Sequence, residues 1–149
     1  MAVINIFSAE NSEGRVDVAR ALDSAGTAMY IYDLPPGQSG GPYHYEYEEE
    51  WLLVIGGSVV LRTPEGERDL QSGDLVCFPA GPAGAHKTMN RSDLPARTLM
   101  FSSSRLPAVS VYPDSNKIGV WPGNETDDLV FRRETAVPSS DGEQSYGSR

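Results

Sequence analysis

Short apolar runs separated by turn residues dominate the pattern of hydrophobic and polar positions along this chain. Aromatic and branched side chains fill residues 28–33, and the run stops at Pro35-Pro36-Gly37. Apolar residues 51–55 and 59–63 flank a glycine turn, as the two strands of a hairpin do. The same pattern predicts further strands at residues 68–70, 75–78, 96–102, 108–112 and 117–121. Helical periodicity is almost absent, so the sequence predicts an all-β fold, an antiparallel sandwich or barrel.

The two ends of the chain differ from this central pattern. Residues 1–7 are apolar and alternating, which predicts a strand, and residues 16–22 fit either a strand or a short helix. The last residues are small, polar and rich in Gly and Ser, which predicts a mobile tail. We therefore expect an N-terminal strand and connecting segment (1–27), one β-barrel domain (28–137) and a flexible C-terminal tail (138–149).

Composition limits the class of protein. A chain of 149 residues with 39% hydrophobic residues is enough for one domain with its own core. No apolar run approaches the ~20 residues that span a bilayer, and no basic, then apolar leader opens the chain. We therefore expect a soluble, cytoplasmic protein, in which the single cysteine, Cys77, is a small buried thiol.

The charge balance makes two kinds of partner improbable on physical grounds. Twelve basic residues stand against twenty-one acidic ones, a formal net charge of −9. Such a charge opposes approach to a phosphate backbone or to anionic lipids. The sequence therefore predicts no nucleic-acid and no membrane partner, and a small molecule as the ligand.

The residues with the most evident chemistry surround the two histidines. On an extended chain, His44, Glu46 and Glu50 project to one face, because alternate side chains share a side of a strand. His86, on another strand, can complete a set of nitrogen and oxygen ligands of the kind that binds Fe, Mn, Zn, Co or Ni. A competing interpretation of the acidic run 46–50 is a solvated edge strand whose charges discourage aggregation.

The spacing of these residues forms two motifs. The first consists of His44, Glu46, Glu50 and Gly57, and the second of Gly73, Pro79, Gly81, His86 and Asn90. Over residues 35–103 the two motifs resemble those of the cupin superfamily. The resemblance implies a cupin-type double-stranded β-helix, that is, a jelly-roll barrel with a pocket at one mouth. It also implies that His44, Glu50 and His86 are metal ligands, with Glu46 as a substitute fourth ligand.

Two departures from the cupin pattern affect the expected site. Glu46 occupies the position of a second histidine, and His86 follows a loop two residues longer than the strict pattern has. Two carboxylates formally neutralise a divalent ion, so the centre is expected to be a poorer Lewis acid and a weaker trap for anions. Asn90 is expected to be a turn residue that bonds the backbone.

These features lead to a main hypothesis and two alternatives. The main one is a metal-binding cupin-like enzyme, of the dioxygenase or sugar-phosphate isomerase type, with Glu46 as ligand or general base. The first alternative is a non-catalytic module that binds or senses a small molecule or sugar. The second is a metal-free isomerase or epimerase that uses His86 as base and a tyrosine as acid. The resemblance also implies a homodimer, with segment 117–134 supplying the contact.

Overall fold

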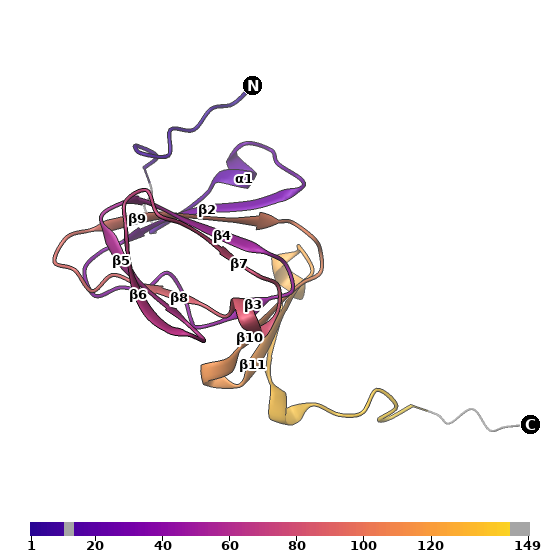
Figure 1. Ribbon diagram of the computed structural model, residues 1–149. Coiled ribbons are helices and arrows are strands. Elements are labelled where there is room, and N and C mark those ends of the chain that lie inside the picture. Colours follow the sequence, from indigo (N-terminus) through magenta and orange to yellow (C-terminus); the bar gives the residue numbers. More distant parts are fainter. Residues whose placement is uncertain (11–13, 144–149) are drawn as a thin grey trace, which may run out of the picture.

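Antiparallel strands enclose a barrel in this protein (Figure 1). The structure, a computed structural model, describes residues 1–10 and 14–143. The largest sheet has the order β1-β2-β9-β4-β7. Its strands are, in that order, Arg15–Asp17, Thr27–Leu34, Ala96–Ser103, Glu50–Gly56 and Leu75–Phe78.

Two smaller sheets form the opposite wall. One has the order β6-β5-β8, with strands Gly66–Gln71, Ser58–Thr63 and Lys87–Met89. The other has the order β12-β11-β10-β3, with strands Leu129–Arg132, Lys117–Trp121, Ala108–Tyr112 and Tyr45–Glu46. An isolated antiparallel bridge between His44 and His86 links the two sheets. The opposite wall is therefore joined at the position of the two histidines.

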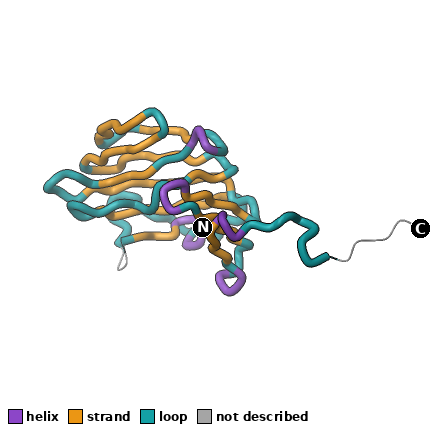
Figure 2. The backbone as a smooth tube through the Cα atoms, turned by 90° about the horizontal axis from the view of Figure 1, so that it is seen from below, coloured by secondary structure: helices purple, strands orange, loops and turns teal. Residues whose placement is uncertain are grey.

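Helical structure is confined to short turns between the strands (Figure 2). The one α-helix among the described residues, α1 (Val18–Ala21), begins at Asp17, whose Oδ1 accepts a hydrogen bond from Arg20 N at 2.9 Å. The 3₁₀ turns are Pro82–Gly84, Pro113–Ser115, Glu125–Asp127 and Arg133–Thr135. No helix in the described part of the chain is long and apolar enough to cross a membrane.

The main core lies between the large sheet and the three-stranded sheet. Leu52 and Val54 of β4 are fully buried, as are Val59 and Leu61 of β5. In both strands the buried residues alternate with less buried ones, because successive side chains of a strand point to opposite faces. The sequence signal that predicted both strands is the pair of runs 51–55 and 59–63 around a glycine turn, and the structure confirms the all-β fold.

The strand predicted at residues 1–7 is wrong. Residues 1–10 contain no strand, although Ile4 and Ile6 pack against the outer face of the large sheet, beside α1. The guanidinium of Arg97 holds this segment by donating to the carbonyl oxygens of Ile6, at 3.2 Å, and Ala9, at 3.0 Å. Partial burial without a partner strand thus accounts for Ile4 and Ile6, whereas Val3 and Phe7 are exposed.

The remaining differences concern short segments. Residues 16–22 contain both of the predicted alternatives, since β1 ends at Asp17 and α1 follows directly. Strands β3, β8 and β12 have only two to four residues; β12 was not predicted, whereas β3 and β8 directly follow His44 and His86, which were expected on strands. Cys77 is half-buried rather than buried, and its thiol lies 3.6 Å from Glu49 Oε1. In the predicted tail, residues 138–143 are exposed, and 144–149 lie outside the described residues.

Candidate functional site

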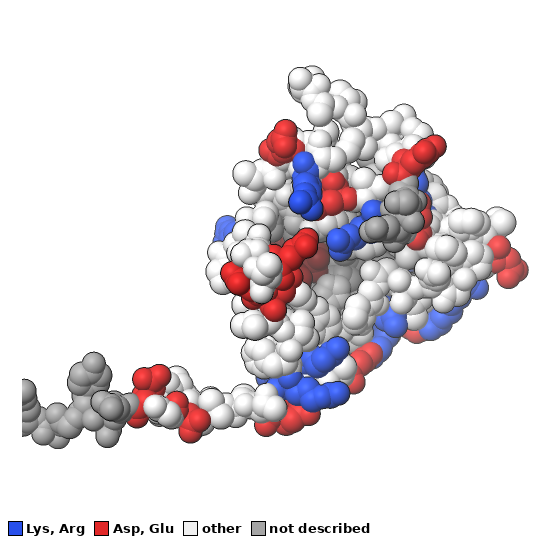
Figure 3. All heavy atoms as spheres, turned by 180° about the vertical axis from the view of Figure 1, so that it is seen from behind, with Lys and Arg blue, Asp and Glu red and all other residues white. Residues whose placement is uncertain are grey.

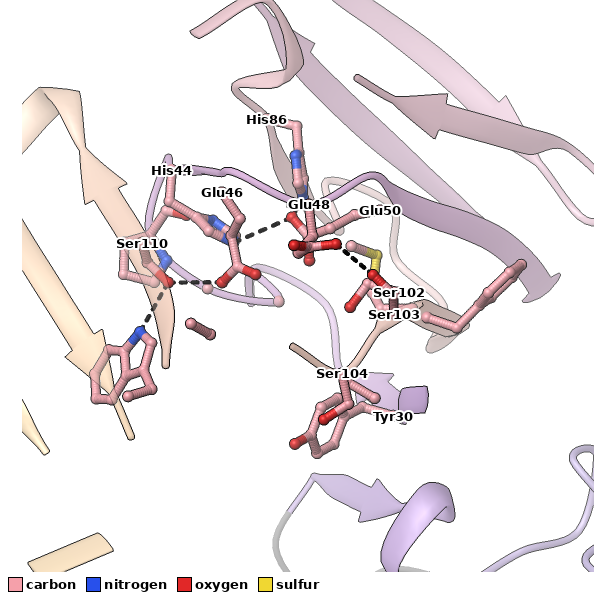
Figure 4. Close-up of a pocket in the computed structure, with 18 of the residues that line it drawn as sticks. Tyr30, His44, Glu46, Glu48, Glu50, His86, Ser102, Ser103, Ser104 and Ser110 are labelled. Carbon is pink, nitrogen blue, oxygen red and sulfur yellow. Dashed lines mark hydrogen bonds and ion pairs between the residues drawn. The ribbon is translucent and has the colours of Figure 1, made fainter. Parts of the chain in front are cut away.

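His44 and His86 face each other across the bridge that joins the two smaller sheets. His44 N donates to His86 O at 3.1 Å, and His86 N donates to His44 O at 2.8 Å. Directly opposed residues of an antiparallel pair project their side chains to the same face. The two imidazole rings accordingly enter the same cavity, with their centroids 4.8 Å apart (Figure 4).

Backbone carbonyls orient both rings in the same way. The Nδ1 atom of His44 lies 3.0 Å from the carbonyl oxygen of Pro42, and that of His86 lies 2.8 Å from the carbonyl oxygen of Gly84. In the tautomer these contacts favour, each Nδ1–H donates and each Nε2 offers a lone pair. His86 Nε2 is buried and has no hydrogen-bond partner among the described residues. Buried polar atoms are normally paired, so this nitrogen fits a metal ligand.

Glu50 completes a cluster of three ligands. Its Oε2 lies 3.8 Å from His44 Nε2 and 3.7 Å from His86 Nε2, and the three ligand atoms all lie within 4.8 Å of one another. Ligands at ~2.1 Å from a tetrahedral ion lie ~3.4 Å apart, so the three atoms would have to draw closer together to close around a cation. Two imidazoles and one carboxylate suit the divalent metals that the sequence predicts. The residues present therefore fit a metal.

The protonation of the cluster follows from its burial. Burial raises the pKa of Glu50 to about 8, and the nearby charge of Glu46 adds to this effect. Burial lowers the pKa of His86 to about 4, although the hydrogen bond to Gly84 opposes the shift. At neutral pH without metal, Glu50 is thus mostly protonated and His86 neutral. A cation that binds here must displace the proton of Glu50.

The structure corrects the prediction that one strand carries His44, Glu46 and Glu50. The chain bends at residues 47 and 48, so β3 ends at Glu46 and β4 begins at Glu50, in a different sheet. Glu50 approaches the imidazoles from the large sheet, where it lies opposite Phe78 of β7 and Ser102 of β9. The three ligands therefore converge from both walls of the barrel.

Glu46 lines the same cavity but stands outside the three-ligand cluster. Ser110 Oγ donates a hydrogen bond of 2.6 Å to Glu46 Oε1. The same hydroxyl oxygen of Ser110 accepts a hydrogen bond of 2.8 Å from Trp121 Nε1. Ser110 is buried and lies opposite Glu46 in the pairing of β10 with β3. The hydrogen-bond chain holds the carboxylate in one place, beside His44 (Figure 4).

The cavity has a volume of about 590 Å³, which is typical of small-molecule sites. Figure 3 shows it as a hollow with acidic and basic side chains at its rim. Besides the predicted residues, its lining includes the hydroxyl and indole side chains of Tyr30, Tyr32, Ser102, Ser103, Ser104, Ser110, Tyr112 and Trp121. It also includes the charged side chains of Arg15, Glu48, Lys87, Arg105, Glu125 and Asp128.

Sequence reasoning missed most of these lining residues. The run 102–104 consists of three serines at the end of a predicted strand, which is a weak signal for a polar wall. Ser110 gives no signal, because it stands within an apolar strand. Only its place opposite Glu46 shows what it does.

The second motif positions His86 through a longer loop. The two additional residues are accommodated in a 3₁₀ turn, Pro82–Gly84, which supplies the carbonyl oxygen that orients the ring. A Cβ on Gly84 would lie 1.8 Å from the carbonyl oxygen of Pro79, so only glycine fits there. Asn90 bonds the backbone as predicted, since its Nδ2 donates to the carbonyls of Leu34 and Leu94 at 2.7 and 2.8 Å.

Comparisons with known proteins agree with this geometry. The family model described as "Cupin domain" matches residues 30–102. A sugar phosphate isomerase from a cupin superfamily of Silicibacter pomeroyi is similar in structure, with a TM-score of 0.74 and 26% identity. The match covers 87% of this chain and 83% of that one. No curated protein matches the sequence.

Two further structures show the same fold at lower identity. A protein of Acidithiobacillus ferrooxidans whose name proposes sugar phosphate isomerase activity has a TM-score of 0.73 and 21% identity, over 83% of this chain and 78% of that one. The polyketide cyclase RemF from Streptomyces resistomycificus has a TM-score of 0.58 and 19% identity, over 72% and 83%. These two structures share the fold, and the match of residues 30–102 to the cupin-domain model, together with the two spaced motifs in the barrel, identifies the chain as a member of the cupin superfamily.

Proposed function

We propose that this cupin is a metal-dependent isomerase that acts on a small, phosphorylated, polyhydroxylated metabolite. The observation that carries the proposal is the position of Glu46. Its carboxylate points into the cavity beside the cluster of His44, Glu50 and His86, yet it is anchored by Ser110 and not by that cluster. The site thus offers three residues that can hold a metal and, separately, a group that can move a proton.

The division of labour follows from this arrangement. A divalent metal held by His44, Glu50 and His86 would supply a Lewis acid that polarises an oxygen of the substrate. Glu46 takes a proton from the carbon that bears a hydroxyl group next to the carbonyl, and it returns the proton to the carbonyl carbon. The hydroxyl proton moves to the former carbonyl oxygen, so aldose and ketose interconvert with no external oxidant or reductant.

The lining of the cavity favours this class of substrate. Hydroxyl side chains such as Ser102, Ser104 and Tyr30 can bond several hydroxyl groups. Arg15 and Arg105 also border the cavity and can bind one phosphate group. The similarity to the Silicibacter pomeroyi isomerase, at 26% identity over most of both chains, supports the same class. We propose a cytoplasmic location, where such metabolites occur and Cys77 stays a thiol.

A deuterium-exchange experiment tests the proposal. Protein loaded in turn with Fe, Mn, Zn, Co or Ni is incubated with a panel of aldose and ketose phosphates in D₂O, and NMR follows interconversion and deuterium uptake at carbon. We expect both with at least one metal. Glu46→Gln should lower both rates by about 10²–10⁴-fold while the metal content stays at that of the wild type. Glu49→Gln is the matched control, because Glu49 is exposed and lies outside the cavity lining.

Two outcomes would contradict the proposal. Wild-type rates in Glu46→Gln would remove Glu46 from the proton transfer. Absence of any exchange, combined with a rise in melting temperature on adding a sugar phosphate, would favour the non-catalytic binding module. Metal analysis of His86→Ala provides a separate readout. Loss of metal from this variant is expected both for the isomerase and for a metal-containing binding module, whereas retained metal would contradict both.

A further inference from the structure

The edge strand β12 presents an apolar surface that nothing in the described chain covers. Leu129, Val130 and Phe131 are 59%, 51% and 42% exposed, and all four residues of the strand are exposed on both of its faces. One edge of β12 pairs with β11, and the other edge is free in the order β12-β11-β10-β3. In Figure 1 this segment is the gold part of the chain that leads to the C-terminus. Free, apolar edge strands readily pair with another chain.

The hydrogen-bonding groups of the free edge follow from the pairing on the other side. Arg133 N donates to Asn116 O at 2.9 Å, so residue 133 directs its backbone groups toward β11. In an antiparallel ladder this direction alternates along the strand, so the backbone N–H and C=O groups of Phe131 and Leu129 also point toward β11. The N–H and C=O groups of Asp128, Val130 and Arg132 consequently point to the free edge.

The sequence of this edge is complementary to itself. Residues 127–133 read Asp-Asp-Leu-Val-Phe-Arg-Arg, two acids, three apolar residues and two bases centred on Val130. Asp128 and Arg132 form no ion pair with another described residue. Both have extended backbone, since φ and ψ are −62° and 130° at Asp128 and −82° and 140° at Arg132. The segment from Asp128 to Arg132 is therefore straight enough to add to a sheet.

We propose that β12 pairs antiparallel with β12 of a second copy, about a two-fold axis at Val130. In this register, Asp128 lies opposite Arg132 of the second copy, and Leu129 lies opposite Phe131. The outward-facing groups of Asp128, Val130 and Arg132 then meet one another, so each opposed pair exchanges backbone hydrogen bonds. The carbonyl of Arg132 already accepts a bond of 2.7 Å from Thr135 Oγ1, and its second lone pair remains available.

Charge selects this register over its neighbour. The hydrogen-bonding pattern also permits the two-fold axis to move by one residue, for example from Val130 to Phe131. That shift would place Asp128 opposite Glu134, two like charges, and Leu129 opposite Arg133. Like charges directly opposed across strands are destabilising. The register centred on Val130 instead gives two ion pairs on one face and two apolar pairs on the other.

The proposed contact reaches the rim of the cavity. Asp128 and Glu125 belong to the cavity lining. Pairing places Arg132 of the second copy opposite Asp128, so a basic residue of one copy borders the acidic rim of the other. The four-residue strands alone bury less area than a stable interface needs, so we expect a dimer that dissociates on dilution.

A charge-reversal series tests the pairing. Sedimentation velocity of the full chain from about 1 µM to 1 mM should show a monomer–dimer equilibrium. Arg132→Asp places Asp opposite Asp128 at both symmetric pairs, so the dimer should dissociate at least about 10-fold more readily. Added salt should partly reverse this loss of affinity. The double variant Asp128→Arg/Arg132→Asp should restore dimerisation. Because these side chains are exposed, thermal melts should show that every variant folds.

Cysteine cross-linking tests the register. In a Cys77→Ser background, Val130→Cys lies opposite itself at an expected Cα distance of about 5.5 Å, which a disulfide can bridge. Oxidation should yield a covalent dimer with Val130→Cys and much less with Phe131→Cys. A wild-type chain that stays monomeric at 1 mM would overturn the proposal, as would unchanged association of Arg132→Asp. Preferential cross-linking at Phe131→Cys would overturn the register.

Discussion

Replacing Glu50 by Gln is expected to stabilise the metal-free protein while removing its metal affinity. Burial holds the pKa of Glu50 at about 8, against 4.5 for an ordinary glutamate. Between these two values the unfolded chain releases the Glu50 proton and the folded chain keeps it. A folded state that binds more protons loses stability as pH rises, so the metal-free wild type should weaken from about pH 5 to pH 8.

The magnitude follows from the two pKa values. A rise from 4.5 to about 8 corresponds to about 5 kcal/mol above pH 8, at about 1.4 kcal/mol for each factor of ten. At pH 7 the same relation gives about 3 kcal/mol. Gln has nearly the shape of a protonated Glu and does not titrate. Glu50→Gln should therefore lie within about 1 kcal/mol of the wild type near pH 5 and exceed it by several kcal/mol at pH 8.

Urea unfolding in the presence of EDTA, followed by the fluorescence of the two tryptophans, measures this difference. His86 contributes the opposite trend, because its pKa is lowered to about 4 and stability is lost as pH falls below 6.5. That trend is common to both proteins and cancels in their difference. Glu49→Gln, with its exposed side chain, should follow the wild type at every pH.

Metal addition completes the test. A divalent cation at pH 8 should raise the stability of the wild type and leave Glu50→Gln nearly unchanged, because the metal takes the place of the Glu50 proton only where a carboxylate is present. Parallel stability profiles of metal-free wild type and Glu50→Gln from pH 5 to pH 8 would refute the reasoning, since they would mean that Glu50 ionises normally in the folded protein.

Two further predictions concern residues of the cupin motifs. Asn90→Ala should lower the free energy of unfolding by about 2–4 kcal/mol in urea, because the buried amide satisfies two backbone carbonyls that would lose their donors; a loss below about 0.5 kcal/mol would contradict this role. Gly57→Ala should cost about 2 kcal/mol or more in the same assay, since φ is +74° and a Cβ would lie 2.6 Å from Pro95 O. Gly56→Ala is its control, because a Cβ there meets no atom within 4 Å, and equal losses in the two variants would argue against the close approach.

The sequence was informative where a local pattern coincides with a structural requirement. Runs of residues around a glycine turn predicted β4 and β5, and the motifs that contain His44, Glu50 and His86 predicted three side chains that the fold brings together. The expectation for residues 1–7 failed because apolar residues such as Ile4 and Ile6 can pack, partly buried, against a sheet without pairing as a strand.

The unpredicted features depend on the meeting of distant segments. The role of Ser110 depends on the pairing of β10 with β3. The position of Trp121 in the cavity wall depends on the pairing of β11 with β10. Neither contact leaves a local periodicity. The convergence of Glu50 with His44 was predicted for the wrong reason, since two sheets bring them together and not one strand.

The backbone bridge between His44 and His86 has a consequence for how such a site can change over generations. Main-chain hydrogen bonds set the separation of these two ligands, and the pairing of β4 with β9 fixes the third. None of these constraints involves the side chain at position 46, where this chain has Glu and the cupin pattern has His. That position can therefore be replaced while the geometry of the candidate ligands persists, so such a barrel can acquire a new reaction without first rebuilding the candidate metal site.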